Sequence, residues 1–339
     1  MKIERDVKLS KFSTFKIGGI AKYFVVVKEE KDVMEAISWA RRRGKKIFVL
    51  GGGSNVLLPD RDYSGLVIKS EIKGIEIIGQ NEEFSIVKSF SGEIWSKLVY
   101  FTINNNLYGS ENLLHVPGTV GAAPVQNIGA YGAELKDVFY NLCAIEIKTG
   151  EKKYFNLKDC NFGYRSSFFK EGGKDKYFIL WVEMKFKKNK EFNLSYGGVR
   201  EKLDEKGIKD PEVKDVVDAI WDIRSSKIPN PAVLPNAGSF FKNPVVSQEF
   251  LNDLRKKFPE IKSFPDKNGF KIPTAWLIEK CGLKGYRQGD AGVFEKQALI
   301  LVNYGRASQK DILNLSDLIR KKVFDKFSID IEPEVSVIK

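Results

Sequence analysis

The sequence predicts a protein of mixed helices and strands, folded into two or three domains. The first observation is a strand, a helix and a second strand over residues 23–50, which together make a β-α-β unit. The second is a series of short strands with alternating apolar residues that begins near residue 70. The third is the proline-rich link Pro229-Asn230-Pro231, which indicates a domain boundary.

The β-α-β unit is defined by its apolar spacing. Residues 23–27 and 47–50 are apolar runs typical of buried strands. Between them, apolar residues at i, i+3, i+4 and i+7 predict a helix that stops at Gly44. These residues are Val33, Ala36, Ile37 and Ala40.

The remaining elements follow from the same patterns. Strands are expected at 75–78, 84–89, 143–148, 178–186, 298–303 and 327–331. Helices are expected at 92–105, 247–258, 274–280 and 308–326. A further helix should start with Asp210 as N-cap and Pro211 as first residue, and end near 224–227.

The charge balance favours anionic ligands. Lys and Arg number 56 and Asp and Glu 44, so the net charge is 56 − 44 = +12. The lysines are scattered, however, and no zinc finger or RNA-binding signature occurs, so we favour a lysine-rich solvated surface over nucleic-acid binding.

Cysteine and histidine usage excludes several kinds of site. Cys143, Cys160 and Cys281 are too far apart for a metal or disulfide motif, so no metal is expected. His115 is the single histidine, which argues against a Ser-His-Asp triad and leaves a structural or ligand-proximal role. With no signal peptide and no apolar run of membrane-spanning length, we expect a cytoplasmic protein.

Two glycine-rich stretches are the strongest candidates for a binding site. The first, Gly51-Gly52-Gly53-Ser54-Asn55, directly follows the strand at 47–50. Free backbone amides in such a turn can form an anion nest for a phosphate or pyrophosphate, although a plain tight turn explains it equally well. The second stretch covers 117–132, and two such loops could hold one long anionic ligand. Neither is a Rossmann or P-loop fingerprint.

Three further stretches can be interpreted either as structural features or as parts of an active site. Arg165, between aromatic residues in 161–168, could make a cation–π contact or bind a carboxylate. Ser239 in 236–244 could lie in a turn or supply an active-site hydroxyl. Glu334 in Glu332-Pro333-Glu334-Val335 could lie in a surface turn or in a tail that returns to a site.

Five motifs together resemble one family in order and spacing. They are 52–57, 117–132, Phe162-Gly163-Tyr164-Arg165, 236–244 and 332–335, and the likeness covers nearly the whole chain. On these motifs the chain resembles the UDP-N-acetylenolpyruvoylglucosamine reductases, flavoenzymes that make UDP-N-acetylmuramate for peptidoglycan.

The resemblance implies an α+β fold with non-covalently bound FAD. A two-lobed FAD-binding domain of the vanillyl-alcohol-oxidase (PCMH) type would be followed by an α+β substrate-binding domain. The implied segments are 1–70 and 71–228 for the two lobes, 229–328 for the substrate domain, and 329–339 for a tail that returns to the active site. Ser54 lies where relatives with covalent flavin often carry a histidine, which argues against a covalent link.

The implied reaction is NADPH-dependent reduction of UDP-N-acetylglucosamine enolpyruvate. Hydride would pass from NADPH to FAD N5 and then to C3 of the substrate, and Ser239 would protonate C2. Arg165 and Glu334 match the other two catalytic residues of the family, and would stabilise negative charge at C2 and its carboxylate.

The resemblance also assigns binding residues. Those matched to the cofactor are Gly51, Gly52, Gly53, Ser54, Asn55, Gly118, Thr119, Gly121, Ala122, Gln126, Asn127 and Gly129. Those matched to the substrate are Tyr164, Tyr196, Lys227, Asn243 and Gln297. Tyr196, in the loop 194–198, indicates the subclass with a substrate-covering tyrosine. NADPH would share the substrate pocket, and a monomer is expected.

Two other functions compete with this interpretation. An oxidase or dehydrogenase on the same flavin fold would share the glycine loops without requiring Ser239, Glu334 and the tyrosine loop together. A basic nucleic-acid-binding protein would show salt-sensitive binding and a colourless preparation.

Overall fold

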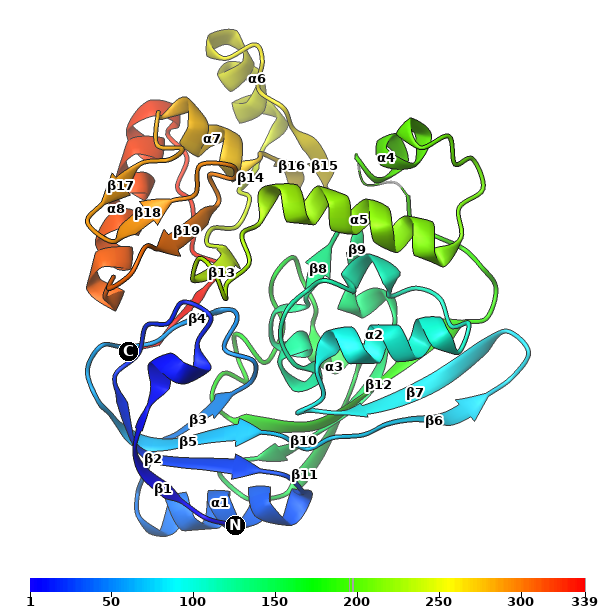
Figure 1. The fold of residues 1–339 in the computed structure, drawn as a ribbon, viewed down its shortest axis with the longest axis vertical. Coiled ribbons are helices and arrows are strands. Elements are labelled where there is room, and N and C mark those ends of the chain that lie inside the picture. The colour runs from blue at the N-terminus through cyan, green and yellow to red at the C-terminus, as the bar shows by residue number, and fades with distance from the viewer. Residues whose placement is uncertain (195, 197, 339) are drawn as a thin grey trace. The chain divides into compact units, whose positions relative to one another are not determined.

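The computed structural model describes residues 1–194, 196 and 198–338, which form two compact units (Figure 1). Unit 1 contains residues 1–7, 20–53 and 62–224. Unit 2 contains residues 8–19 and 54–61 together with the chain from residue 225 onward. The chain therefore passes between the units several times, and the division into four functional segments stays a prediction.

The first sheet of unit 1 has the strand order β1-β2-β5-β3. Its members are β1 (Glu4–Lys8), β2 (Ile20–Val27), β3 (Ile47–Leu50) and β5 (Tyr63–Ser70). β5 pairs in parallel with both β2 and β3, which requires a crossover, and α1 (Glu30–Arg42) supplies it. The four apolar residues expected on the helix face are all buried, and Gly44 follows with a left-handed φ of 60°.

The second sheet of unit 1 is antiparallel, in the order β11-β10-β12-β7-β6. Its strands are β6 (Ile75–Gln80), β7 (Phe84–Phe90), β10 (Phe139–Glu146), β11 (Lys152–Asn156) and β12 (Tyr177–Lys187). The alternate apolar residues of β12 are buried, as its sequence pattern predicts. One apolar cluster joins α1 and β2 to Cys143, Phe178 and Leu180 of this sheet, so the two sheets share a core.

Short elements lie around the second sheet. They are α2 (Trp95–Asn104), η2 (Glu111–Leu113), η3 (Val120–Gln126), β8 (Gly129–Ala130), β9 (Ala133–Glu134), η4 (Leu135–Asp137) and α3 (Leu157–Cys160). Among them, η3 and β8 carry the expected binding residues Gly121, Ala122, Gln126 and Gly129. Two further helices, α4 (Val199–Glu205) and α5 (Val213–Lys227), lie after the tyrosine loop (Figure 1).

Unit 2 packs three helices and two small antiparallel sheets around its own core. One sheet has the order β13-β19-β18-β17, from β13 (Asn236–Ser239), β17 (Arg287–Gln288), β18 (Ala291–Val293) and β19 (Ile300–Asn303). The other contains β14 (Val245–Val246), β15 (Phe264–Asp266) and β16 (Gly269–Lys271). The helices are α6 (Gln248–Lys257), α7 (Thr274–Lys280) and α8 (Gln309–Phe327), and η1 (Leu9–Phe12) joins the unit through the N-terminal segment. β4 (Val56–Leu57) pairs in parallel with β20 (Ser336–Val337).

Two expected elements are wrong. Residues 327–331 do not form a strand, because α8 continues through Phe327 and Arg320 Nε donates to the Ile331 carbonyl in place of a strand ladder (3.0 Å). The helix expected from Asp210-Pro211 begins at Val213 instead. There the Asp215 carboxylate accepts the backbone N–H of Glu212 (2.8 Å), which caps the first turn without the proline.

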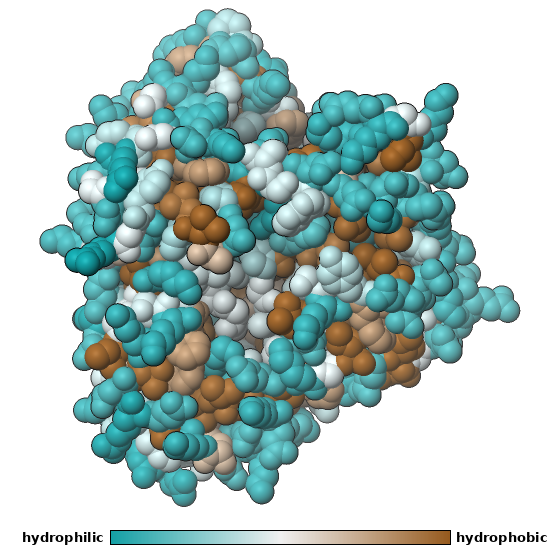
Figure 2. Space-filling view, viewed as in Figure 1, coloured by the Kyte–Doolittle hydropathy of each residue, from teal (hydrophilic) through white to brown (hydrophobic). Residues whose placement is uncertain are grey.

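On the face that Figure 2 shows, hydrophilic residues cover most of the surface and hydrophobic residues appear as separate patches. Across the part of the chain that the structure describes, no helix has the length and apolar character needed to cross a bilayer.

The capping box of α8 provides a test of local stability. Ser308 Oγ accepts the backbone N–H of Asp311 (3.1 Å), and the Asp311 carboxylate accepts the backbone N–H of Ser308 (2.9 Å). Ser308→Ala should lower the free energy of unfolding by about 1 kcal/mol in urea titrations at neutral pH. Ser38→Ala, on an exposed position of α1, is the matched control and should be close to neutral.

The effect of Ser308→Ala should depend on pH. The bonds from the backbone N–H and hydroxyl of Ser308 lower the pKa of Asp311, so this carboxylate stabilises the fold above its unfolded value of about 3.9. That stabilisation is lost as the pH falls through the lowered folded pKa. The difference in the free energy of unfolding between wild type and Ser308→Ala should therefore become smaller at acidic pH. A difference that does not change with pH would contradict the role of Asp311 in capping.

Candidate active site

The two glycine-rich stretches meet inside unit 1. A Cβ atom on Gly52 would lie 2.9 Å from Cα of Gly118, and one on Gly51 would lie 2.9 Å from the Thr119 hydroxyl and 3.0 Å from Cβ of Ala122. Contacts this short leave no room for side chains at Gly51 and Gly52. The two loops therefore present backbone to each other.

The same loops satisfy a test of fit for a phosphate-bearing cofactor. Gly53 and Gly118 have left-handed φ angles of 65° and 126°, which orient backbone amides in ways that other residues rarely allow. Among the described residues, the buried Thr119 hydroxyl has no hydrogen-bond partner. An unsatisfied polar group beside a glycine contact fits a loop shaped around a ligand.

Ser54 and Asn55 belong to unit 2, although they continue the first glycine loop. The Asn55 amide donates to the Glu334 carbonyl (3.4 Å), and the backbone N–H of Ser336 donates to the Asn55 carbonyl (3.1 Å). This end of the loop is therefore fixed to the C-terminal tail.

Arg165 lies in a tight turn in unit 1. Gly163 and Ser166 exchange two backbone hydrogen bonds (3.0 and 3.3 Å), and Arg165 between them has a left-handed φ of 53°. Its guanidinium lies 5.2 Å from the Tyr164 ring centroid and donates through Nη2 to the Gly129 carbonyl. The cation–π contact left open by the sequence is therefore present, and a forked cation of this kind also suits a carboxylate.

Gln126 ends η3, and Asn127 and Gly129 follow it in the second glycine stretch. Asn127 is fully buried, and its side chain is bonded to three protein groups. A Cβ on Gly129 would come within 2.6 Å of Arg165 Nη1, so glycine is required there for the arginine to lie alongside. This part of the second stretch thus packs against Arg165.

Tyr196 lies beside an aromatic and cationic group that the sequence did not single out. Its ring meets that of Tyr131 edge-to-face, with centroids 5.4 Å apart, and Arg224 hydrogen-bonds to Tyr131. Burial raises the pKa of Tyr131 and lowers that of Arg224. Ser195 and Gly197, which flank Tyr196 in the expected loop, lie outside the described residues.

Two side-chain amides hold the chain at Asn193, directly before the tyrosine loop. Asn112 Nδ2 donates to the carbonyls of Tyr131 (2.6 Å) and Asn193 (2.8 Å), and Asn193 Nδ2 donates to the Gly132 carbonyl (2.9 Å). The loop is therefore tied at its start to the second glycine stretch.

In unit 2, Ser239 is the last residue of β13, directly after a left-handed glycine. Gly238 has a φ of 71°, and its backbone N–H donates to Oδ1 of the buried Asn236 (2.9 Å). Ser239 itself pairs with Ile300 of β19. The serine is thus placed by a rigid strand and by a turn that a buried asparagine fixes.

Glu334 lies next to this strand. The backbone N–H of Glu334 donates to the Phe240 carbonyl (2.7 Å), and the backbone N–H of Lys242 donates to the Glu332 carbonyl (2.9 Å). The tail expected to return to a site therefore runs along the segment that follows Ser239, within unit 2.

Three expected substrate residues also belong to unit 2. Asn243 accepts the backbone N–H of Thr274 at the start of α7 (2.9 Å), which leaves its amide nitrogen directed away from that bond. Gln297 lies in the turn before β19, where its carbonyl accepts the N–H of Ile300 (3.0 Å). Lys227 is the exposed last residue of α5.

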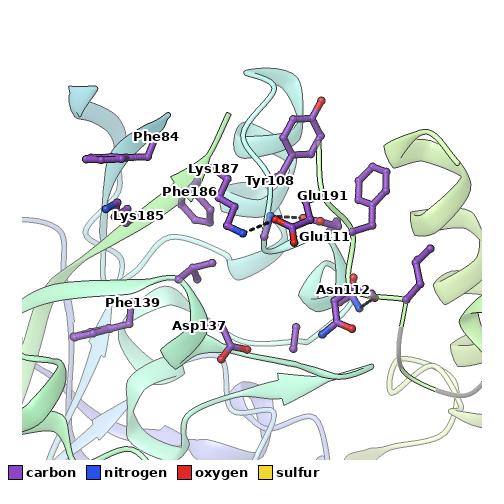
Figure 3. A pocket seen from close by; sticks show the side chains of 16 residues that line it. Phe84, Tyr108, Glu111, Asn112, Asp137, Phe139, Lys185, Phe186, Lys187 and Glu191 are labelled. Carbon is purple, nitrogen blue, oxygen red and sulfur yellow. Dashed lines mark hydrogen bonds and ion pairs between the residues drawn. The ribbon is translucent and has the colours of Figure 1, made fainter. Parts of the chain in front are cut away.

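A cavity of about 670 Å³ opens in unit 1 beside the start of the tyrosine loop (Figure 3). Its lining includes Glu111, Asn112, Phe139 and residues 191–194, with an ion pair between Lys187 and Glu191 (2.5 Å). None of the site residues expected from the sequence lines it. The cavity is connected to the expected site through Leu194, which lines it and is the first residue of the loop that carries Tyr196.

The single histidine packs in unit 1 against the same helix that carries Arg224. The His115 ring lies 4.8 Å from that of Trp221, and burial with the nearby Arg224 cation lowers its pKa. A neutral imidazole at neutral pH follows, which agrees with a structural or ligand-proximal role. Within the described ranges, no cluster of His, Cys, Asp and Glu could hold a metal ion.

Sequence reasoning missed Tyr131, Arg224 and the buried amides of Asn112 and Asn236. Tyr131 stands between Ala130 and Gly132 in a stretch that was recognised, so an aromatic residue amid glycines was an available signal. Arg224 and Asn112 gave none, because their partners are distant in sequence, whereas Asn236 bonds to the nearby residues Leu234 and Gly238.

Comparison with known proteins adds to this geometry. Residues 230–338 match the family model described as "UDP-N-acetylenolpyruvoylglucosamine reductase, C-terminal domain", and residues 21–154 match "FAD binding domain". The chain is 45% identical to the UDP-N-acetylenolpyruvoylglucosamine reductase of Flavobacterium johnsoniae over 340 residues, covering 100% of both. It is 42% identical to that of Pseudomonas aeruginosa over 335 residues, covering 98% of both.

Solved structures agree at the level of fold. The Thermus caldophilus reductase structure matches with a TM-score of 0.71 at 23% identity, covering 100% of both chains. A 6-hydroxy-D-nicotine oxidase from Arthrobacter nicotinovorans matches with a TM-score of 0.52 at 10% identity, covering 97% of this chain and 86% of the other.

These matches confirm the expected fold class, an FAD-binding domain of the PCMH type followed by a C-terminal domain. They also confirm FAD as the cofactor and a flavin-dependent oxidoreductase as the class of enzyme. With full-length identity of 45% to a named reductase, the chain belongs to the UDP-N-acetylenolpyruvoylglucosamine reductase family.

Proposed function

We propose that the protein reduces UDP-N-acetylglucosamine enolpyruvate to UDP-N-acetylmuramate with NADPH, in peptidoglycan synthesis. The observation that carries this proposal is identity of 45% over the full length of a reductase of that name. The likeness to the nicotine oxidase, at 10% identity, concerns the fold alone and does not favour an oxidase. A cytoplasmic location and a monomeric state remain predictions.

The reaction adds a hydride to C3 and a proton to C2 of the enolpyruvyl group. When bound, FAD supplies the hydride that it has received from NADPH. Negative charge then develops at C2 and spreads into the carboxylate, where the forked donors of Arg165 would stabilise it. Ser239 would give its proton to C2, and Glu334 would stabilise the developing charge in its protonated form or through a water molecule.

Ser239 suits the donor role because its position is well defined. It ends β13, and the backbone of Glu334 is bonded to the neighbouring Phe240. A serine hydroxyl is a weak acid, so a neighbour such as Lys227 or a proton relay must resupply it.

The substrate diphosphate calls for cations and polar donors. Lys227, Asn243 and Gln297 in unit 2 would supply them, with Tyr164 beside Arg165 on unit 1. We assign the protein to the subclass with a substrate-covering tyrosine, because Tyr196 is 46% exposed and packs against Tyr131. NADPH would occupy the same pocket before the substrate, in a ping-pong order.

The two glycine loops would hold the FAD pyrophosphate without a covalent bond. Their residues are Gly51, Gly52, Gly53, Ser54 and Asn55 in the first loop and Gly118, Thr119, Gly121, Ala122, Gln126, Asn127 and Gly129 in the second. Support comes from the close backbone approach at Gly52 and Gly118.

The reaction can be tested anaerobically in two steps. NADPH should bleach the visible flavin band, and UDP-N-acetylglucosamine enolpyruvate should restore it without oxygen. Ser239→Ala should leave bleaching nearly intact and slow the return of the band by roughly 100-fold or more. Ser263→Ala, at a serine of the same unit that accepts a bond from Arg255 (3.0 Å), serves as control. A wild-type band that stays bleached would contradict the function, and equal losses in both steps would remove Ser239 from the donor role.

The FAD loops can be tested by Gly52→Ala. The added Cβ would meet the backbone of Gly118 at 2.9 Å, which neither loop can relieve without moving. We expect a preparation with much less flavin per protein, measured by absorbance after denaturation. Gly79→Ala is the matched control, since its Cβ would meet only Ile86 Cδ1, at 3.9 Å. Full FAD content in Gly52→Ala would place the cofactor elsewhere.

The tyrosine loop can be tested by Tyr196→Phe. Loss of a hydroxyl that bonds to a diphosphate should weaken substrate affinity roughly 10-fold or more and leave FAD content unchanged. The control is Tyr154→Phe, at a tyrosine of β11 that is 63% exposed. Loss of FAD with unchanged substrate affinity would show that the loop does not cover the substrate.

A further inference from the structure

We infer that Asn127 is the residue that positions Arg165 for its proposed role. The inference rests on the proposed function, since it explains how the arginine is held. As part of the proposed FAD loop, Asn127 would contribute the course of its backbone. Its fully buried side chain would touch neither the substrate nor the cofactor and would act through the turn that carries Arg165.

The side chain of Asn127 is fully buried and is bonded to three residues in two segments of the chain. Its Nδ2 donates to the Glu134 carboxylate (3.0 Å) and to the Gly163 carbonyl (3.1 Å), and its Oδ1 accepts the backbone N–H of Lys136 (3.0 Å). Three of the four hydrogen-bonding positions of the amide are thus occupied by protein groups. The residue also has a left-handed φ of 46°, which asparagine tolerates better than most residues.

The bond to Gly163 supports the backbone of the arginine turn. The Gly163 carbonyl also accepts the N–H of Ser166 (3.3 Å), the bond that closes the turn. Arg165 within this turn has a left-handed φ of 53°, a conformation that costs a non-glycine residue about 1–3 kcal/mol. Such a conformation persists only where neighbouring groups hold it, and the Asn127 amide is one of those groups.

The bond to Glu134 supports the other end of the same arginine. Glu134 in β9 pairs with Gly129 in β8, and the Gly129 carbonyl accepts from Arg165 Nη2. A Cβ on Gly129 would lie 2.6 Å from Arg165 Nη1 and 3.0 Å from Glu134 Cγ, so arginine and glutamate both border this glycine. One amide therefore fixes the backbone of Arg165 and the hairpin that receives its guanidinium.

The chemistry requires an amide at this position. Both Asn127 donors face acceptors, one a carboxylate and one a carbonyl. An aspartate has the same shape but would present oxygens to both, at a buried site where the repulsion is poorly screened. Asn127→Asp should therefore loosen the turn without creating a cavity.

The first test separates the two half-reactions of the holoenzyme. In Asn127→Asp, return of the flavin band with UDP-N-acetylglucosamine enolpyruvate should slow roughly 10- to 100-fold, the usual effect of misplacing a reacting group. The rate of bleaching by NADPH should change only a few-fold, and the amount of FAD per protein should be the same as in wild type. If Asn127→Asp does not fold, Asn127→Gly keeps the left-handed backbone, removes the amide and should give the same selective loss.

The matched control is Asn303→Asp in unit 2. Asn303 is 1% exposed, and it also uses Nδ2 to bind a carbonyl, that of Phe15 (3.0 Å), and Oδ1 to accept two backbone N–H groups. It should lose stability without a selective loss of substrate reduction. If Asn127→Asp and Asn303→Asp slow both half-reactions to the same extent, Asn127 contributes only to stability, and the inference is overturned.

A structural readout completes the test. Hydrogen exchange at the amides of Gly163 and Ser166 should be faster in the Asn127→Asp holoenzyme than in wild type. Adding Glu134→Gln to Asn127→Asp supplies an amide donor facing the new carboxylate, and should recover part of both the exchange protection and the reoxidation rate. Unchanged exchange with an unchanged reoxidation rate would overturn the inference. A wild-type enzyme that the substrate cannot reoxidise would instead refute the proposed function.

Discussion

The close approach of Gly52 to Gly118 is the constraint on which unit 1 depends. Any side chain at Gly52 would lie within 2.9 Å of the Gly118 backbone, so two loops from distant parts of the sequence can meet only as bare backbone. This contact brings the end of β3 to the start of η3, and the loop after η3 then runs on to the hairpin that contacts Arg165. The second of the proposed cofactor loops and the hairpin beside the proposed catalytic arginine thus lie on one piece of chain.

Buried asparagines recur beside three of the loops for which we propose a function. Asn127 fixes the arginine turn, Asn112 anchors the start of the tyrosine loop, and Asn236 fixes the turn before Ser239. Loops of this kind have no strand ladder, so their buried carbonyls and N–H groups need side-chain partners. A short amide supplies donors and an acceptor together without carrying charge into the interior, which explains its use at all three positions.

The two units divide the proposed chemistry between them. Unit 1 carries the glycine loops, Arg165 and the tyrosine loop, whereas unit 2 carries Ser239 and the tail with Glu334. Within unit 2, the bond from Glu334 to the Phe240 carbonyl couples the C-terminal tail to the strand that ends at Ser239. Residues 334–337 are therefore fixed within this unit, where β20 also pairs with β4.

The sequence by itself determined the family, the fold class and most regular elements, because these depend on local periodicity and on motifs of fixed spacing. α7 was predicted at its exact bounds and β12 and α8 within a residue, since each buries one regular apolar face. Only the tertiary structure decided that 327–331 is not a strand, that Tyr131 contacts both Tyr196 and Arg224, and that Asn127 holds the arginine turn. Each of these depends on hydrogen bonds or ring contacts between residues far apart in sequence, and no local pattern encodes such a partner.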